Sequence, residues 1–477
     1  MTQRSALMAR RPLAAALFVA LIAPGMAFAQ TAKEKALEAR VAELERQVQL
    51  LLSSQQQQQT QIATTQEQVT QVQAAQAAKP AVPAGKQPIQ GTTIMTAANP
   101  GTTFSYGGFI KMDAMATDTS DGRIADGSSG RLFYVPSTIP VAGAGADGGD
   151  PYADFHAQFS RFWLSADHVT DSGDKFKGFV EMDFFGGGSN ALAGNETATN
   201  TYAVTLRHAY VSWNNWLAGQ TWSNFMDVAA LPDAVDFVGP TDGTVFVRQA
   251  QLRYTQGPWS FSVENPQTTV TPYRTGTRFN SGDNALPDVT ARWLTKGDWG
   301  HFTVAGMVRQ FKLLDETDTG ASVSVSGRFN LGKSDDIRYA VNAGQGNFGS
   351  SDDLRYMANY GSGIGRYMAF GLGSDVMQDA GGDIEALDGW GGFVAWRHVF
   401  SPKVRTNLMY SASHFDNDAA FTGFGVTERT QSMHANVIYS PFPKLDLGAE
   451  LIYGQRSLED DREGDLKRLH TSVKYAF

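Results

Sequence analysis

The end of the chain alternates strictly between apolar and polar positions. From Leu469 to Phe477 every second position is apolar except for Thr471, and polar residues or alanine lie between them. The same period-two pattern returns over residues 176–184 and 445–453. Segments of about ten residues with one apolar and one polar face are typical of tilted membrane-spanning strands. Strands of soluble sandwiches alternate as well, so the pattern alone leaves both classes open.

The spacing of the turns favours the membrane class. Short turns rich in Gly, Asn, Ser or Pro alternate along the chain with long polar connections. The tight turns lie near residues 172, 214, 257, 297, 333, 402 and 442, and the long connections span residues 118–152, 186–199, 266–286, 348–388 and 415–427. Strands are expected to start near residues 103, 153, 174, 200, 215, 244, 258, 287, 299, 320, 336, 389, 403, 427, 443 and 466. Short and long connections alternate in the same way in transmembrane barrels, which have an even number of strands. We therefore expect an all-β fold, a 16-stranded antiparallel transmembrane barrel over residues 103–477, with both ends on the periplasmic side.

Aromatic residues lie beside the short turns, where a barrel carries its interfacial girdle. They are Trp213, Trp216, Trp259, Trp299, Tyr439 and Phe442. The alternative is that these residues cap a soluble core. A 16-stranded barrel would instead enclose an aqueous lumen.

Residues 1–29 have the pattern of a secretory signal peptide. Arg4, Arg10 and Arg11 precede an apolar run over residues 13–22, and Ala27 to Ala29 form a small-x-small cleavage site. The apolar run is too short for a membrane-spanning anchor helix. The pair Arg10–Arg11 leaves a twin-arginine export route as an alternative. Either route takes the protein out of the cytoplasm.

Residues 30–78 carry a heptad pattern that predicts a coiled-coil segment. The core positions are Leu37, Val41, Leu44, Val48, Leu51, Ile62, Val69 and Val72, with polar residues in the register between Leu51 and Ile62. So narrow an apolar stripe favours self-association. A disordered tail rich in Gln and Ala is the alternative. Residues 79–102 contain four prolines and form a Pro/Gly-containing linker.

Composition argues against several other functions. The formal net charge is −9 and no cysteine is present, which disfavours nucleic acid as a partner and excludes thiolate metal sites. The eight histidines show no metal-ligand spacing, so we expect no metal and no cofactor. Ser432 and His434 share one strand face, but such pairs arise by chance and we expect no enzyme activity.

The alternation of inward and outward positions along each expected strand assigns thirteen basic residues and seven acids to the lumen. The basic residues expected to line the pore are Lys111, Arg161, Arg207, Arg253, Arg292, Arg309, Arg338, Arg397 and Arg405, together with Lys175, Lys177, Arg468 and Lys474. The acids on the same parity are Asp113, Asp167, Glu181, Asp183, Glu264, Asp446 and Glu450. A positive lumen favours anions, and arginine matches carboxylates bidentately.

The connection over residues 223–243 is too apolar for a solvent-exposed loop. We expect it to fold into the barrel and narrow the lumen, with Asp227, Asp233 and Asp236 facing the basic residues. Packing against a neighbouring subunit is the alternative.

Four segments make the chain resemble the DcaP-type trimeric porins of Gram-negative outer membranes. They are Tyr106–Asp113, Leu206–Tyr210, Leu217–Asp227 and Val235–Pro240. The resemblance covers essentially the whole mature chain, and residues 217–240 are its most specific part. It implies homotrimers, a periplasmic coiled coil, and passive uptake of small anionic solutes such as dicarboxylates.

The terminal residue Phe477, with Tyr475 two positions before it, resembles the signal read by the barrel-assembly machinery. Outer-membrane lipid and lipopolysaccharide are then the expected surroundings. A second hypothesis is an envelope tether, in which the barrel is mainly an anchor. The heptads would span about 50 Å at 1.5 Å per residue, enough to approach peptidoglycan.

Overall fold

The computed structural model describes residues 92–96, 102–142, 149–185, 200, 202–332, 352–368 and 370–477, with the backbone alone for 92–96. The expected signal peptide, coiled-coil core and Arg338 lie outside these residues, as does most of the linker. The chain divides into two compact units, residues 1–87 and 88–477. The second unit contains every described residue.

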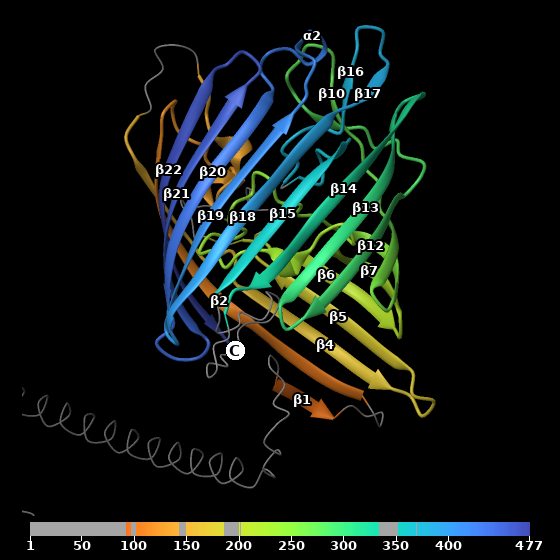
Figure 1. Cartoon of the computed structure of the whole chain (residues 1–477), viewed down its shortest axis with the longest axis vertical. Helices are drawn as coiled ribbons and strands as arrows, with labels where there is room; N and C mark the ends of the chain where they lie inside the picture. The colour runs from red at the N-terminus through yellow and green to blue at the C-terminus, as the bar shows by residue number, and fades with distance from the viewer. Residues whose placement is uncertain are drawn as a thin grey trace, which may run out of the picture. The chain divides into compact units, whose positions relative to one another are not determined.

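Antiparallel strands make up nearly all of this unit (Figure 1). The strands are β1 Thr92–Thr96, β2 Thr102–Thr119, β3 Tyr152–His156, β4 Arg161–Val169, β5 Lys175–Asp183, β6 Thr205–Trp213, β7 Trp216–Trp222, β8 Arg248–Gln256, β9 Trp259–Glu264, β10 Thr269–Thr271, β11 Phe279–Asn280, β12 Asp288–Gly297, β13 Gly300–Leu313, β14 Glu316–Asn330, β15 Asp353–Ser362, β16 Val376–Gln378, β17 Ile384–Ala386, β18 Asp388–Ser401, β19 Val404–Phe415, β20 Thr427–Tyr439, β21 Leu445–Leu458 and β22 Glu463–Ala476. The helices are short: α2 Ala419–Thr422 and the 3-10 turns η1 Ser129–Arg131, η2 Pro136–Thr138 and η3 Val228–Ala230. None of the helices described has the length and apolar character needed to cross a membrane.

The main sheet closes on itself. Its first long strand, β2, pairs with the last strand, β22, between Phe109 and Thr119. On its other edge β2 pairs with β4 along its first half and with β3 along its second half, so β3 and β4 are two parts of one wall segment. With β1 outside the wall, the 18 strands of this sheet give the expected 16-stranded closed barrel.

The wall follows the alternation seen in the sequence. On β14, Ser322, Ser324 and Ser326 are buried inside, whereas Val323 between them is 42% exposed on the outside. Two-residue hairpins join several strands, and Asn214 takes the positive φ (49°) that such a turn requires. The polar face therefore points into the barrel and the apolar face points outward.

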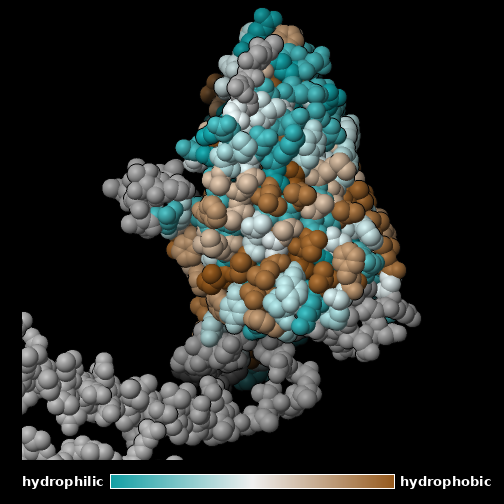
Figure 2. Space-filling model, turned by 90° about the vertical axis from the view of Figure 1, so that its left-hand side faces the viewer, coloured by the Kyte–Doolittle hydropathy of each residue, from teal (hydrophilic) through white to brown (hydrophobic). Residues whose placement is uncertain are grey.

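An apolar belt surrounds the wall. Figure 2 shows hydrophobic residues across the middle and lower part of one face, beneath a hydrophilic end. Large apolar side chains are exposed on strands all around the barrel, for example Ile110, Leu252, Val308 and Leu451. A closed sheet with an outward apolar band is the form in which strands span a bilayer.

Several connections differ from the sequence expectation. The strand expected near residue 336 begins at Asp353, inside the expected long connection 348–388. The turn expected at 332–334 lies mostly outside the described residues. Leu314 and Asp315 form a two-residue hairpin at the long-loop end of the barrel. Short and long connections therefore alternate less regularly than the sequence indicated.

Two long connections form a second sheet that the sequence did not predict. Strands β10 and β11 from residues 265–287 join β16 and β17 from residues 363–387 in the order β11-β10-β16-β17. Buried Arg309 on the wall binds both connections, because its guanidinium donates to the backbone oxygens of Gln267 and Gly363 and to Asp375. The second sheet is thus fixed to the wall at its base.

Candidate solute constriction in the barrel lumen

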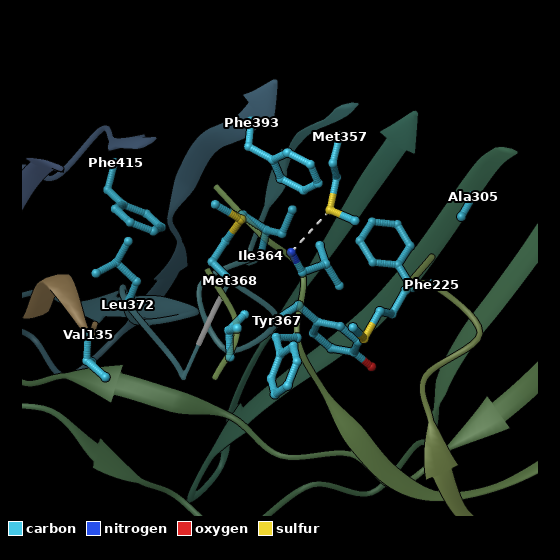
Figure 3. Close-up of a cluster of buried hydrophobic side chains, with 14 of the residues drawn as sticks. Val135, Phe225, Ala305, Met357, Ile364, Tyr367, Met368, Leu372, Phe393 and Phe415 are labelled. Carbon is cyan, nitrogen blue, oxygen red and sulfur yellow. Dashed lines mark hydrogen bonds between the residues drawn. The ribbon is translucent and has the colours of Figure 1, made fainter. Parts of the chain in front are cut away.

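Residues 223–247, between β7 and β8, fold into the lumen. This segment, here called the constriction loop, contributes Phe225, Met226 and Val245 to a large buried apolar cluster. Figure 3 shows Phe225 among inward side chains of the wall, including Met357 and Phe393. Burial of these apolar residues accounts for the loop's position away from solvent.

Hydrogen bonds attach the constriction loop to strands around the barrel. The amide of Asn224 donates to Glu264 Oε1 on β9 (2.7 Å). Lys111 Nζ on β2 donates to the backbone oxygen of Val235 (2.7 Å). The amide of Gly243 donates to Ser411 Oγ on β19 (2.8 Å). The loop is therefore a fixed crossing element, held at its beginning, middle and end.

The three acids of the constriction loop pair with nearby wall residues. Asp233 Oδ2 lies 2.5 Å from Arg405 Nε, and Asp227 Oδ2 lies 2.8 Å from His301 Nε2. Asp236 Oδ2 accepts from the amide of Tyr134 (2.8 Å) and lies 3.4 Å from a nitrogen of His470. The expectation that all three face arginines therefore matches Asp233, whereas Asp227 and Asp236 meet histidines.

Burial and ion pairing act in opposite directions on Asp233. Burial alone would raise its pKa, but the Arg405 guanidinium beside it holds that pKa below the ordinary value. His301 has the same effect on Asp227, whose pKa is also lowered against burial. Asp242, deeper in the loop, differs because burial dominates and raises its pKa. Asp233 and Asp227 are thus stabilised as carboxylates where they attach the loop.

Four of the basic residues expected in the lumen are paired with buried acids. The pairs are Lys111–Asp113 (2.8 Å), Arg309–Asp375 (2.6 Å), Arg397–Asp353 (3.3 Å) and Arg405–Asp233 (2.5 Å). The charges of Lys111, Arg309 and Arg405 are largely neutralised by these partners, whereas Arg397 shares Asp353 with Arg355 (2.8 Å). These side chains fasten loops and strands together.

Other expected lumen residues bind backbone oxygens. Arg292 Nη1 donates to Met226 (3.2 Å), and Arg253 donates to Trp222 and, through Nε, to Gln251 Oε1 (2.9 Å). Arg468 donates to the backbone oxygen of Gly130 (2.6 Å). Of the remaining expected residues, Lys175 is exposed, Lys177 lies 3.5 Å from Asp167 and Lys474 lies 5.4 Å from the centre of the Phe109 ring.

Three arginines gather where β4, β6 and β8 face the constriction loop. Arg207 pairs with Glu181 (2.8 Å) and Asp183 (2.7 Å), and Arg161 Nε lies 3.5 Å from the same Glu181 oxygen. Arg248 is the third. Glu181 and Asp183 are thus ion-paired with Arg161 and Arg207, whereas Arg248 has no ion pair within the described residues and adds a positive charge beside them.

Arg248 was not expected at this place, because parity on its strand selected Arg253. It is the first residue of β8, and its guanidinium lies 4.9 Å from the centre of the Trp222 ring. Its buried Nη1 has no hydrogen-bond partner within the described part of the chain. The sequence signal that could have found it is its place directly after the apolar connection, opposite Trp222 in the strand register.

A small cavity lies between the arginines and the loop. Its volume is about 20 Å³, and Arg161, Arg207, Trp222, Asp236, Phe237 and Phe246 are among its lining residues. A space of this size is enough for about one water molecule. Guanidinium groups, aromatic rings and the carboxylate of Asp236 therefore surround a very small space.

The lumen also contains a Ser–His–Glu arrangement. Ser432 Oγ lies 3.2 Å from His434 Nε2, and His434 Nδ1 lies 2.8 Å from Glu450 Oε1. The serine hydroxyl, however, donates to Asp242, which also accepts from the Tyr134 hydroxyl (3.0 Å). All three members are at most 2% exposed, so the arrangement fits attachment of the loop. No group of His, Asp or Glu suited to a metal ion occurs among the described residues.

Comparisons with known proteins agree with this architecture. The model of the DcaP outer membrane protein family matches residues 22–477. The crystal structure of the outer membrane channel DcaP of Acinetobacter baumannii is similar, with a TM-score of 0.62 and 26% identity over 80% of this chain and 99% of that chain. OmpT of Vibrio cholerae has a TM-score of 0.45 and 11% identity, covering 81% of this chain and 99% of that one. An anion-selective porin from Comamonas acidovorans has a TM-score of 0.45 and 10% identity, covering 79% of this chain and 100% of that one.

No curated protein sequence matches the chain. The family match nevertheless extends over the whole barrel, and the DcaP channel shares its fold over nearly its full length. The earlier resemblance, which was carried by residues 106–113 and 206–240, is thereby confirmed. A closed 16-stranded wall with an outward apolar belt is the fold expected of such a protein. The chain belongs to the DcaP outer membrane protein family and lies in the outer membrane.

Proposed function

We propose that this protein is a porin for passive diffusion of small, preferentially anionic solutes such as dicarboxylates. The observation that carries the proposal is the group of Arg161, Arg207 and Arg248 beside the constriction loop, in which Arg248 has no ion pair among the described residues. An uncompensated charge in a narrow, partly dry passage attracts counter-ions strongly. Guanidinium groups also match carboxylates geometrically.

The pore-lining basic residues have two roles in this proposal. Arg161, Arg207, Arg253 and Arg292 contribute to the field that solutes meet. Lys111, Arg309 and Arg405 act mainly by holding loops, because each bonds directly to a residue of a connection. Arg397 pairs with Asp353 of the neighbouring wall strand. The acids Asp227, Asp233 and Asp236 keep the constriction loop in place. Arg338 is retained as a pore residue from sequence parity alone.

Assembly follows the sequence pattern. The signal peptide 1–29 is removed, residues 30–78 form a periplasmic coiled coil, and the barrel is a homotrimer in lipid and lipopolysaccharide. Deleting residues 30–78 should leave an inserted barrel, because the hydrogen bonds of the wall are made within the sheet. Failure of this variant to insert would show that the tail is an integral part of the barrel.

The end of the chain is proposed as the signal for the barrel-assembly machinery. The amide of Phe477 donates to the backbone oxygen of Gly108 (3.1 Å), and its ring lies 6.0 Å from that of Phe162, so the residue also closes the barrel seam. Phe477→Ala should lower the assembled outer-membrane fraction, measured by heat-modifiable migration. Conductance of the channels that do assemble should stay unchanged. Normal assembly with altered conductance would contradict the proposal.

Solute flux through reconstituted protein tests the function. Liposomes containing the purified protein should swell faster in a small dicarboxylate than in a neutral sugar of similar size. The swelling preference should shrink at about 1 M salt, where the screening length is about 3 Å. A protein that inserts but passes neither solute nor ions would favour the tether hypothesis.

A further inference from the structure

Six phenylalanine rings meet inside the barrel. This group, here called the aromatic plug, consists of Phe133, Phe159, Phe185, Phe237, Phe246 and Phe370. Neighbouring rings lie between 4.1 and 6.4 Å apart, centre to centre. The rings come from three separate long connections and from the wall beside β4 and β5. No single loop therefore accounts for the plug.

The apolar cluster around the plug reaches across the lumen. It joins Phe159, at the junction of β3 and β4, to Met307 on β13, Met357 on β15 and Met409 on β19. These strands lie on opposite sides of the closed sheet. Figure 3 shows Met357 and Phe393 of the wall close to Ile364 and Met368 of the connection 363–387. A 16-stranded wall ordinarily encloses water, so an apolar bridge across it calls for an explanation.

We propose that the aromatic plug is a hydrophobic gate that must part before a solute crosses the barrel. This inference rests on the proposed function as a channel. Phe133 and Phe159 have no exposed surface, and Phe237 and Phe246 are at most 9% exposed, so the rings exclude water from the space between them. An apolar constriction of this kind stops ions because water does not fill it. The cavity of about 20 Å³ beside Phe237 and Phe246 is also too small for a solute.

Phe370 is the member most suited to withdraw. It is only partly buried, and it contacts Phe133 (4.8 Å) and Phe246 (5.2 Å). Its φ is 61°, a left-handed conformation that is unfavourable for a residue with a side chain, and Gly371 beside it has φ 65°. By contrast, Phe159 and Phe237 are stacked at 4.1 Å with nearly parallel rings, so they form the fixed part.

Removing one ring should loosen the gate. Phe370→Ala should raise the mean single-channel conductance by about twofold or more, because the apolar bridge becomes shorter and fills with water more readily. Phe424→Ala is the matched control, since this ring is 61% exposed in the connection 416–426 and lies outside the plug. Equal conductance in the two variants would contradict the proposal that the aromatic plug is a gate.

Chemical cross-linking tests the same point within one assembled channel. The chain has no cysteine, so Phe133→Cys combined with Phe370→Cys introduces a single pair of thiols. A short bifunctional methanethiosulfonate should bridge the pair and lower conductance, and a reductant should restore it. Each channel is compared with itself before and after treatment, which removes differences in folding. A single-cysteine variant with the same reagent is the control.

The outcomes separate the gate from the channel function. If the bridge forms, shown by the mass of one linker joined to both cysteines, and conductance is unchanged, the plug does not lie in the solute path. If the thiols never become bridged, the two rings are not neighbours and the gate is equally overturned. If neither the wild type nor Phe370→Ala conducts after insertion, the proposed channel function itself has failed.

Discussion

The two sides of the constriction loop are held in different ways. Toward β19, β21 and β22, the loop is attached through buried polar contacts, among them Asp233–Arg405, Val235–Glu450 and Asp236–His470. Toward β4 and β6, the loop faces Arg161 and Arg207 across a small cavity that it lines with apolar side chains and Asp236. Arg248 on β8 lies over the Trp222 ring of the same cavity. On the first side the charged groups of these contacts have polar partners, whereas on the second side Arg248 has no ion pair within the described residues.

This difference shows that an arginine in the lumen need not determine which ions pass. Arg309, between Asp288 (3.2 Å) and Asp375 (2.6 Å), is fully buried and acts as a structural fastener. Arg248 has a buried nitrogen without a hydrogen-bond partner among the described residues. Selectivity should therefore depend on where charge is left over.

Arg207→Gln should have the largest effect on selectivity. It leaves Glu181 and Asp183 buried beside the cavity with Arg161 and Arg248 as the remaining cations, so the local excess of positive charge disappears. A unit charge within about 8 Å at an effective dielectric constant of about 20 is worth about 2 kcal/mol, so the anion-to-cation permeability ratio should fall roughly thirtyfold. Reversal potentials under a salt gradient measure this ratio. An unchanged ratio would show that the arginine group lies outside the solute path.

Arg248→Gln sharpens the comparison because it removes charge without leaving a close acid partner. The permeability ratio should fall several-fold, and barrel stability, measured by heat-modifiable migration, should stay at the wild-type level. Arg309→Gln on the opposite type of site is the matched control. It should destabilise the attachment of the second sheet, since unpairing a buried ion pair costs about 3–5 kcal/mol. If Arg248→Gln destabilised the barrel and Arg309→Gln lowered the permeability ratio instead, the assignment of selectivity to Arg248 and of attachment to Arg309 would be wrong.

Asp233→Asn breaks the attached side of the loop. Arg405 keeps Asp446 (3.2 Å) but loses its ion pair to the loop, so the loop should become more mobile and current fluctuations should increase. The anion preference should shift only slightly, toward anions, because one acid is removed far from the arginine group. Single-channel recording gives both quantities. A loss of anion preference as large as that in Arg207→Gln would contradict the proposed separation of roles.

Acidification should have the smallest effect. The pKa of Asp233 is lowered below its ordinary value of 3.8, so its contribution to loop attachment is complete above that value and is lost only as pH falls through the lowered pKa. Current fluctuations should therefore be the same at about pH 7 and about pH 5, and should approach those of Asp233→Asn well below about pH 4. An increase already at about pH 6 would show that another group controls the attachment.

The fold could be predicted because its signals are local. Alternation along each strand and the turn residues between strands are properties of neighbouring positions, as Ser322 to Ser326 on β14 illustrate. The entry of residues 223–243 into the barrel was also indicated, by their apolar character. The strand at Asp353–Ser362 was misplaced because its surroundings offered competing turn residues.

The details of the site depend on contacts between distant residues. Strand parity cannot predict that Arg309 pairs with Asp375, 66 positions away, or that Asp236 pairs with His470. Parity therefore predicted which face each arginine lies on but not which charges are neutralised. The aromatic plug is similar, since its six rings are brought together by three connections that close over one another.

The reversal potential of the wild-type channel tests the central claim most directly. Purified protein in a planar bilayer, under a potassium chloride gradient centred near 0.15 M, where the screening length is about 8 Å, should give the sign of an anion-selective pore. The preference for anions should weaken strongly at about 1 M salt, where the screening length is about 3 Å. Cation selectivity near 0.15 M would contradict the proposal that the group of Arg161, Arg207 and Arg248 governs permeation.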